Sequence, residues 1–581
     1  MRVLANACLT IILSLGLATG QALSVNAASP AAVQADHGMV VSAHRLASEV
    51  GVDILKRGGN AIDAAVAVGY ALAVVYPSAG NIGGGGGFMT IRLKDGQTRF
   101  LDFRERAPQA ASKDMYLDSS GNVAPDRSTA GYLAVGVPGS VLGLETALER
   151  FGTLERAEVM APAITLARDG FVLDDGDAAV FAGGAKKLGK DAEVSRIFLK
   201  DGKHYVAGDR LAQSDLADSL QAISNQGADA FYKGPIADKI VKASAAKGGI
   251  LATADFAAYK VREMQPITCR YRGYDIISSP PPSSGGVILC EILNILEGYP
   301  LSYLGPGSAE TVHVMVEAMR YAYADRNAAL GDPDFVENPV STLLDKAYAA
   351  KIRAKIAPFR AGKSEAVKPL AMAESQETTH YSIVDEQGNA VSVTYTLNGS
   401  FGAGVVADGT GILLNNEMDD FTSKPGVANL YGLIQGEANA IAPGKTPLSS
   451  MSPTIVTKDG KLFMVIGSPG GARIITITLE TILNVIDHGM TISEAIDAPR
   501  IHHQWLPDKV VMEPFALSRD TQKILADMGY DVGIDPKWTI WGQAAGILLG
   551  GDSLRSIESG GGARLNGAMD ARSLTGRAIG Y

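Results

Sequence analysis

The sequence predicts a mixed fold of helices and strands, of the α/β or α+β class. With 581 residues, 46% of them hydrophobic and 20% charged, the chain can bury a large core. Residues 136–326 read as mainly helical with short connectors. Residues 378–397 and 454–466 instead alternate between apolar and polar side chains around turns, which is the pattern of β-hairpins. One half of the chain is therefore rich in helices, and the other half contributes paired strands.

The first 27 residues have the order of regions found in export signals. A short positive start at Arg2 precedes an apolar run from residue 8 to 18, and residues 25–27 have the small-x-small pattern of a cleavage site. The apolar run is too short to span a membrane as a helix of the mature protein. We expect residues 1–27 to be a signal peptide that exports the protein and leaves no stable membrane anchor.

The composition argues against several partners and cofactors. The net charge of −10 and the lack of a basic patch argue against nucleic acid, whose phosphates would be repelled. No metal is predicted, because the eight histidines are scattered and neighbours such as His502 and His503 face one ligand poorly. No cofactor is predicted, because the sequence lacks a Walker motif and a dinucleotide fingerprint. Cys269 and Cys290 fit a disulfide and two buried thiols equally well.

Two helices are expected near the start of the mature chain. Residues 42–57 read as an amphipathic helix, and Asn60 can cap the buried helix that follows. Five glycines at 83–87 then precede an expected strand at 88–93. A phosphate loop requires a helix after the glycines, so we interpret this run as close backbone packing, or flexible positioning, beside an active site.

An exposed loop separates the helical half from the hairpins. Residues 280–286 form a proline-rich bend into a helix. Residues 357–377 lose apolar periodicity, as expected for a loop where a chain tolerates cleavage. The first hairpin begins directly afterwards. Beyond the second hairpin, Ser468-Pro469-Gly470-Gly471 opens a long apolar helix at 474–486.

Thr378 stands at the start of the first hairpin. A threonine hydroxyl is a poor nucleophile without a base, but cleavage before Thr378 would create an α-amine with a pKa of about 7.7–8.0 that can take its proton. Nucleophile and base would then belong to one residue. A threonine at a strand start is also explained by β-propensity, so local sequence leaves both interpretations open.

The wider pattern resembles the γ-glutamyltranspeptidases over essentially the whole mature chain. The motif T-T-H-Y-S-I-V-D-E-Q-G-N-A-V-S-V-T-Y-T-L-N begins at Thr378. It is followed in the same order by L-N-N-E-M-D-D-F at 414–421, P-L-S-S-M-S-P at 447–453 and G-S-P-G-G at 467–471. Upstream, D-F-R-E at 102–105 and the bend at 280–286 resemble large-subunit motifs of the family.

The resemblance implies a four-layer αββα sandwich of the N-terminal-nucleophile hydrolases, with two central sheets between helical layers. It also implies autocleavage between Glu377 and Thr378. A large subunit of residues 28–377 and a small subunit of residues 378–581 would then remain together as a heterodimer. The expected location is the bacterial periplasm, or outside the cell.

The resemblance also assigns site residues. Thr378 is expected to attack a γ-glutamyl amide, Thr396 to orient Thr378, and Gly470 and Gly471 to stabilise the oxyanion with amides at a helix start. Arg104, with Ser449 and Ser450, matches the ligands of the substrate's α-carboxylate, and Asp420, with Glu417 and Asn398, those of its α-ammonium. The residues matched to substrate binding are Arg104, Thr396, Asn398, Glu417, Asp420, Ser449, Ser450 and Gly471. Taken singly, each reads as an ordinary turn or surface residue.

The expected function is a self-cleaving γ-glutamyltransferase and glutathione hydrolase. Its substrates would be γ-glutamyl compounds such as glutathione, and its acyl-enzyme would react with water, an amino acid or a dipeptide. Residues 425–432 resemble the family's lid loop, with Tyr431 covering the site, although a plain surface turn has similar composition. Two alternatives are kept, a cephalosporin or glutaryl acylase of the same fold and a catalytically dead secreted binding protein.

Overall fold

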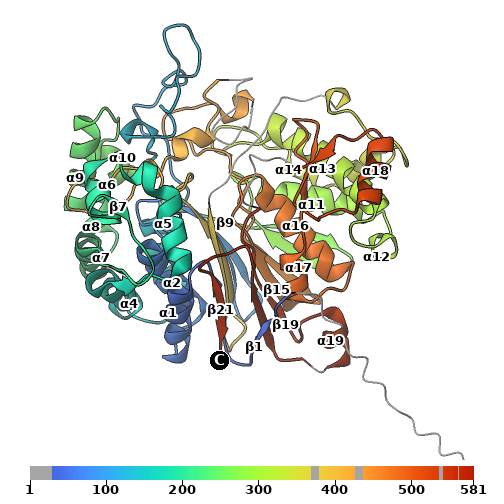
Figure 1. Ribbon diagram of the computed structural model, residues 1–581, viewed down its shortest axis with the longest axis horizontal. Helices are drawn as coiled ribbons and strands as arrows, with labels where there is room; N and C mark the ends of the chain where they lie inside the picture. Colours follow the sequence, from blue (N-terminus) through green and yellow to red (C-terminus); the bar gives the residue numbers. More distant parts are fainter. Residues whose placement is uncertain (1–28, 368–377, 425–435, 535–540, 561) are drawn as a thin grey trace, which may run out of the picture.

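The computed structural model describes residues 29–367, 378–424, 436–534, 541–560 and 562–581. Two antiparallel sheets pack face to face in the centre, and helices cover both outer faces (Figure 1). The predicted αββα sandwich is confirmed.

The first sheet has the strand order β21 (Arg577–Gly580), β2 (Met39–Ser42), β12 (Thr379–Val384), β13 (Ala390–Tyr395), β3 (Gly87–Arg92), β4 (Thr98–Asp102), β9 (Arg262–Met264). The second has the order β1 (Val33–Ala35), β20 (Leu565–Met569), β19 (Ala545–Leu549), β15 (Lys461–Gly467), β14 (Thr454–Lys458), β11 (Tyr274–Ser278), β10 (Ile267–Tyr271).

Two helical layers enclose these sheets. The first sheet is covered by α1 (Arg45–Lys56), α2 (Ala61–Val75) and α3 (Ser140–Phe151), with α4 (Arg156–Asp169), α5 (Asp175–Leu188) and α7 (Ser214–Gln226) beyond them. The second sheet is covered by α11 (Gly285–Leu296), α16 (Arg473–Ile486) and α17 (Ile492–Asp497), with α13 (Ala309–Ala329) packed on α11. The other helices are α6 (Ala192–Phe198), α8 (Asp229–Tyr232), α9 (Pro235–Ala246), α10 (Thr253–Ala258), α12 (Leu301–Leu304), α14 (Val340–Leu343), α15 (Lys346–Arg353), α18 (Arg519–Asp527) and α19 (Leu554–Ser559). Short strands are β5 (Phe171–Val172), β6 (Leu199–Lys200), β7 (Lys203–His204), β8 (Arg210–Leu211), β16 (Ile501–His502), β17 (Val510–Met512) and β18 (Val532–Gly533).

The predicted helices and hairpins form as expected. The Asn60 side chain accepts from the amides of Ile62 and Asp63, and Asp63 accepts from the Asn60 amide, which completes a capping box at the start of α2. Every residue of α2 is buried, because almost all of them are small or apolar. The two hairpins, β12–β13 and β14–β15, lie in different sheets and pack against each other through side chains such as Val384 and Val465.

The stretch at 136–326 is mainly helical, as expected, but residues 262–278 within it form strands that the sequence did not predict. Three strands, β9, β10 and β11, occupy that region and extend both sheets at one edge. Positive φ angles at Arg272 and Gly273 form the tight turn between β10 and β11. β10 alternates between half-buried and exposed residues, as an edge strand with one solvent-facing side does.

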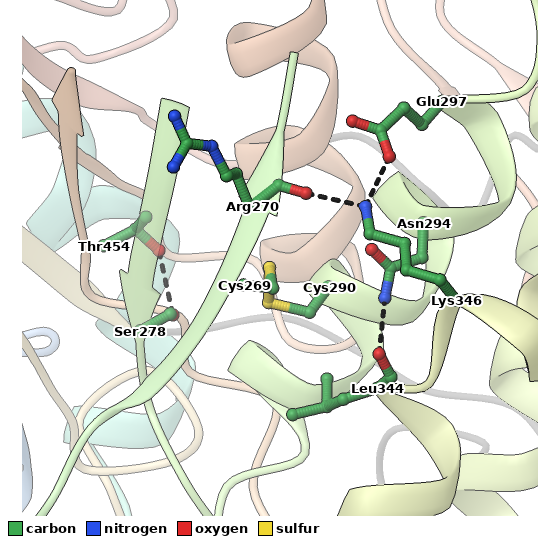
Figure 2. The surroundings of a disulfide bond; sticks show 9 residues. All are labelled: Cys269, Arg270, Ser278, Cys290, Asn294, Glu297, Leu344, Lys346 and Thr454. Carbon is green, nitrogen blue, oxygen red and sulfur yellow. Dashed lines mark hydrogen bonds and ion pairs between the residues drawn. A yellow bond between two sulfur atoms is a disulfide. The ribbon is translucent and has the colours of Figure 1, made fainter. Parts of the chain in front are cut away.

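Cys269 and Cys290 form a disulfide, with a sulfur–sulfur distance of 2.00 Å (Figure 2). The bond joins the edge strand β10 to α11, the helix that covers the second sheet. On the outer side of α11, the Asn294 amide donates to the Leu344 carbonyl at 3.0 Å. The disulfide therefore ties a strand with only one neighbour to the helical layer. In the described part of the chain, no helix has the length and apolar character needed to cross a membrane.

Replacing both Cys269 and Cys290 by Ala is expected to lower the free energy of unfolding by about 3 kcal/mol, because the bond closes a loop of 21 residues in the unfolded chain. Urea denaturation of the oxidised parent and of the double variant measures this difference. Reductant should destabilise the parent but not the double variant. Equal stability of parent and variant without reductant would contradict the prediction.

Candidate active site

The residues expected around the nucleophile meet at one edge of the first sheet. Thr379 pairs with Tyr395 at the end of the β12–β13 ladder, so the same register places Thr378 opposite Thr396. Beyond β13 come β3 and then β4, whose end leads into Arg104. With neighbouring strands about 4.8 Å apart, the step from β12 to β4 is roughly 14 Å. An arginine side chain and a γ-glutamyl group together can bridge that span.

Thr378 is only 8% exposed and lines a cavity of about 350 Å³. Pro469 and Gly470 line the same cavity, on the side formed by the second sheet and α16. The structure therefore places the expected nucleophile and the expected oxyanion turn at one cavity, although they lie about ninety residues apart in sequence.

The Gly470-Gly471 turn presents backbone amides at the start of α16. Its carbonyls accept from the amides of Arg473, at 3.1 Å, and Ile474, at 3.0 Å, and so continue into the helix. Within the described part of the chain, neither glycine amide donates to a protein acceptor. Both glycines have positive φ, 135° and 59°, which side chains rarely allow. The turn is therefore a pair of free donors beside a helix N-terminus, the arrangement that stabilises a developing oxyanion.

Thr396 and Asn398 are held together next to Thr378. The Thr396 hydroxyl accepts from the Asn398 amide at 2.8 Å, and the Thr396 amide donates to Gly86 at 3.0 Å. Asn398 has a φ of 74°, and its side chain donates to the Asn416 carbonyl at 3.1 Å. These contacts fix the Thr396 hydroxyl at the sheet edge, where the register places Thr396 opposite Thr378.

Arg104 lies fully buried among three carboxyl groups. Its Nη1 donates to Glu417 at 2.8 Å and its Nη2 to Asp420 at 2.7 Å, and Nη2 lies 3.3 Å from a Glu105 oxygen. Asp420 is the most accessible of the three, with 16% of its side chain exposed, whereas the two glutamates are fully buried. Arg104, the predicted ligand of the α-carboxylate, and Asp420, the predicted partner of the α-ammonium, are therefore in direct contact. This closeness suits a substrate in which both groups are attached to one Cα atom.

Burial dominates the protonation of this cluster. It raises the pKa of Glu417 to about 8, with neighbouring Asp420 adding to the rise and Arg104 opposing it. Burial likewise raises the pKa of Glu105 well above its usual range and that of Asp420 above its ordinary value. Burial alone would lower the pKa of Arg104, but the three carboxyl groups hold it above the ordinary value. At neutral pH the cluster thus contains a charged arginine and a protonated Glu417.

Ser449 and Ser450 are supported by Ser284, in the predicted bend at 280–286, and by Arg326, which the sequence did not single out. Ser449 accepts at its carbonyl from the amide and the hydroxyl of Ser284, at 2.8 and 2.7 Å. Buried Arg326, on α13, donates to the hydroxyls of both Ser284 and Ser450 at 2.8 Å. The bend predicted at 280–286 therefore acts as a support for the serine pair, and Arg326 joins them to the helical layer.

The glycine run at 83–87 is confirmed as close packing. A Cβ at Gly85 would overlap the Glu417 side chain, and one at Gly86 would overlap the Phe103 carbonyl. Gly86 also has a φ of 74°. The glycines therefore let the backbone of this segment pack directly against Glu417 and the Phe103–Arg104 backbone.

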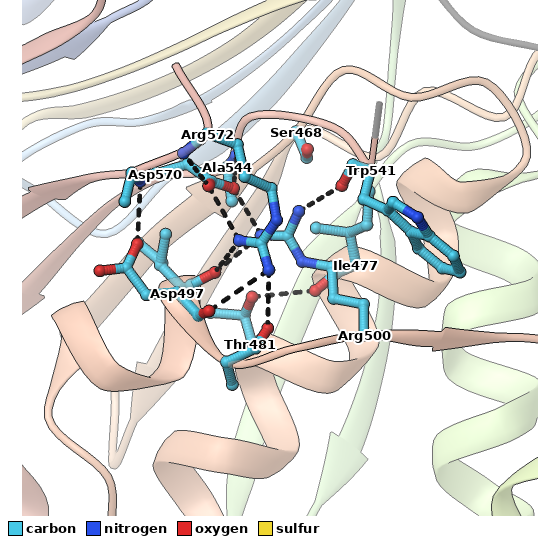
Figure 3. A network of polar contacts seen from close by, with 12 residues as sticks. Ser468, Ile477, Thr481, Asp497, Arg500, Trp541, Ala544, Asp570 and Arg572 are labelled. Carbon is cyan, nitrogen blue, oxygen red and sulfur yellow. Dashed lines mark hydrogen bonds and ion pairs between the residues drawn. The ribbon is translucent and has the colours of Figure 1, made fainter. Parts of the chain in front are cut away.

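A buried ion network lies close to the Gly470-Gly471 turn (Figure 3). Asp570 pairs with Arg500 at 2.5 Å and with Arg572 at 2.9 Å, and it accepts from the Ala544 amide at 3.0 Å. Although burial alone would raise the pKa of Asp570, the two arginines hold it below the ordinary value. Arg500 also donates to the Trp541 carbonyl. The network fixes residues 541–544, of which Gly542 lines the cavity of Thr378 and packs on Pro469.

Several predicted features lie outside the described residues. These are the signal peptide at 1–27, Glu377 before the expected cleavage site, and the lid loop with Tyr431. The described residues contain no cluster of three or more His, Cys, Asp or Glu side chains suited to a metal ion.

Comparisons with known proteins show the family of the chain. The sequence profile of the family described as gamma-glutamyltranspeptidase matches residues 47–577. A glutathione hydrolase proenzyme of Pseudomonas sp. (strain A14) is 60% identical over 561 residues, which cover 96% of both chains. Another, from Escherichia coli (strain K12), is 50% identical over 554 residues, covering 94% of this chain and 93% of the relative. A solved cephalosporin acylase from Bacillus halodurans has a TM-score of 0.82 at 26% identity and covers 96% of this chain and 98% of its own. The chain therefore belongs to the γ-glutamyltranspeptidase family.

Proposed function

We propose that this protein is a self-cleaving γ-glutamyltransferase and glutathione hydrolase with Thr378 as its nucleophile. The observation that carries the proposal is the cavity that Thr378 shares with Gly470, at the start of the Gly470-Gly471 turn, whose amides are free to bind an oxyanion. The Arg104 cluster at the same sheet edge supplies opposite charges for an α-amino acid group. Family membership and relatives described as glutathione hydrolase proenzymes support the same activity.

The reaction follows from these groups. The Thr378 hydroxyl oxygen attacks the carbonyl carbon of a γ-glutamyl amide, and the α-amine of Thr378 takes the hydroxyl proton. The amides of Gly470 and Gly471 stabilise the tetrahedral oxyanion, and Thr396 orients the nucleophile. The carbon–nitrogen bond then breaks, and the departing amine receives the proton. The resulting ester on Thr378 reacts with water, which gives glutamate, or with the amine of an amino acid or dipeptide, which gives a new γ-glutamyl amide.

The γ-glutamyl group would be held by its α-carbon substituents. Arg104, with Ser449 and Ser450, binds the α-carboxylate, and the guanidinium fork suits a carboxylate well. Asp420, with Glu417 and Asn398, binds the α-ammonium.

Processing is part of the proposal. Residues 1–27 are removed during export to the periplasm or medium, and cleavage between Glu377 and Thr378 yields subunits of residues 28–377 and 378–581. N-terminal sequencing of the purified protein tests both steps together. It should return two sequences, one starting near Ala28 and one starting at Thr378. A single sequence from an active preparation would refute the cleavage.

A cephalosporin or glutaryl acylase is the second candidate, because a protein described as a cephalosporin acylase shares the fold closely. A glutaryl group has no α-ammonium, so Asp420 would lack its partner in that reaction. Rates with γ-glutamyl-p-nitroanilide and glutaryl-p-nitroanilide separate the two. We expect at least a hundredfold preference for the γ-glutamyl compound. Equal rates would favour the acylase, and no release from either compound would indicate a dead site.

The KM for γ-glutamyl-p-nitroanilide is expected to rise as the pH passes about 8. Glu417 has a pKa raised to about 8, so it is neutral below that pH and charged above it, where it competes with the substrate carboxylate for Arg104. Glu417→Gln keeps the shape of the neutral form at every pH and should remove this rise. Because the substrate is unchanged, its own titration affects both proteins alike. The same alkaline rise in KM in both proteins would contradict the assignment.

A further inference from the structure

The cavity beside Thr378 lies on the side of that residue away from Arg104. In the first sheet, β13, β3 and β4 follow β12 towards Arg104, whereas β2 and β21 lie on its other side. Leu574, just before β21, lines the cavity with Thr378. The registers pair Tyr381 with Ser42 and Ser42 with Arg577, so β21 begins at the same sheet edge as Thr378. If the acyl group extends towards Arg104, the amine of the substrate must extend into this cavity.

One wall of the cavity is a small, apolar face of α5. It is formed by Ala179, Val180, Gly183 and Gly184. Gly184 packs against Phe401, whose ring a Cβ at Gly184 would overlap. A Cβ at Gly183, in contrast, would meet no atom within 4 Å. Gly183 is therefore not needed for packing, and its missing side chain leaves space open beside the reaction centre.

A second, lysine-rich cavity continues from the first. Its volume is about 550 Å³, and it shares Gly183 with the cavity of Thr378. Lys186, Lys187 and Lys190 line it. Lys187 donates to the Ser400 carbonyl at 2.9 Å and so supports the loop after β13, whereas Lys186 and Lys190 are exposed. Of the two aspartates that line it, Asp191 already pairs with Lys247 at 2.8 Å. On a chain with a net charge of −10, this is a local positive site.

We propose that these two cavities, here called the α5 channel, bind the amine side of the reaction, first the leaving amine and then the acceptor. The open space at Gly183 takes a small residue, and Lys186 and Lys190 attract a carboxylate, so the channel favours short peptides over uncharged amines. This inference rests on the proposed function. In the transfer step the acceptor nitrogen attacks the ester carbon on Thr378. The bond to the threonine oxygen breaks, and that oxygen regains the proton that the amine loses.

Gly183→Leu tests the channel by filling it. The readout is the partition of the acyl-enzyme, measured as γ-glutamyl-glycylglycine against glutamate at fixed γ-glutamyl-p-nitroanilide and glycylglycine. This ratio does not depend on how fast the acyl-enzyme forms. We expect it to fall at least tenfold, because glycylglycine needs the channel and water does not. Ala182→Leu adds the same side chain at an exposed position of α5 that lines neither cavity, and its ratio should stay within twofold of the parent. An unchanged ratio in Gly183→Leu would overturn the proposal.

The lysines are tested with a pair of acceptors that differ only in charge. The parent should use glycylglycine better than glycylglycinamide at neutral pH. Replacing Lys186 and Lys190 by Ala should reduce that preference at least threefold, and replacing both by Arg should keep it. If the alanine variant keeps the full preference, the lysines do not bind the carboxylate. Failure of the proposed function would look different, since the parent itself would then release no p-nitroaniline.

Discussion

Thr378→Ala is expected to yield a single uncut chain that releases no amine from any γ-glutamyl donor. The variant removes the Thr378 hydroxyl, which lines the same cavity as Gly470. Without the hydroxyl the preceding bond is not attacked, so the α-amine that would serve as base is never formed. Because the variant lacks the nucleophilic hydroxyl and also never forms the α-amine base, the loss of activity should exceed a thousandfold. Denaturing electrophoresis and p-nitroaniline release measure cleavage and turnover.

The neighbouring residue provides a matched control. Thr379 pairs with Tyr395 inside the ladder, and its buried hydroxyl has no hydrogen-bond partner in the described structure. Thr379→Ala should therefore still cut itself and keep most of its activity. Thr378→Ser, which retains a hydroxyl and an amine, should cut more slowly than the parent but should recover measurable turnover. Two subunits from Thr378→Ala would refute the role of Thr378 in cleavage.

Local patterns predicted the elements that carry the site better than the site itself. The alternation at 378–397 and the glycine pair at 470–471 located the hairpin and the start of α16, because periodicity and turn residues act over a few positions. The edge strands β9 and β10 were missed, since short half-exposed strands have a weak pattern. The αββα arrangement and the residue roles came from the family resemblance, not from periodicity.

Contacts between distant segments could not be inferred from the sequence. Nothing near Arg326 indicates that it donates to Ser284 and Ser450, and the pairing of Arg500 with Asp570 joins residues seventy positions apart. The same holds for Arg104, whose direct contact with Asp420 depends on how β4 and the segment after Asn416 converge. Such long-range polar contacts are decided by tertiary packing, which sequence spacing does not encode.

Arg104→Ala is expected to lower kcat/KM for γ-glutamyl-p-nitroanilide by roughly a hundredfold to a thousandfold, mainly through KM. Removing one partner of a buried ion pair costs about 3–5 kcal/mol, and in the proposed complex the guanidinium would also bind the substrate carboxylate. The variant should still cut itself, because Arg104 lies three strands away from Thr378. Arg104→Lys keeps the charge but loses the fork, so its KM should fall between those of parent and Ala variant.

A donor without the α-carboxylate separates substrate binding from a loss of local structure. The p-nitroanilide of 4-aminobutyric acid keeps the amide, the chain length and the amino group of the γ-glutamyl donor but lacks its α-carboxylate. The parent should use it poorly, and Arg104→Ala should use it no worse than the parent does, since the missing contact is already absent. Equal losses with both donors would mean that Arg104 only holds Glu105, Glu417 and Asp420 in place. An unchanged KM of Arg104→Ala for the γ-glutamyl donor would contradict the assignment, because loss of the group that binds the substrate carboxylate must weaken binding of that donor.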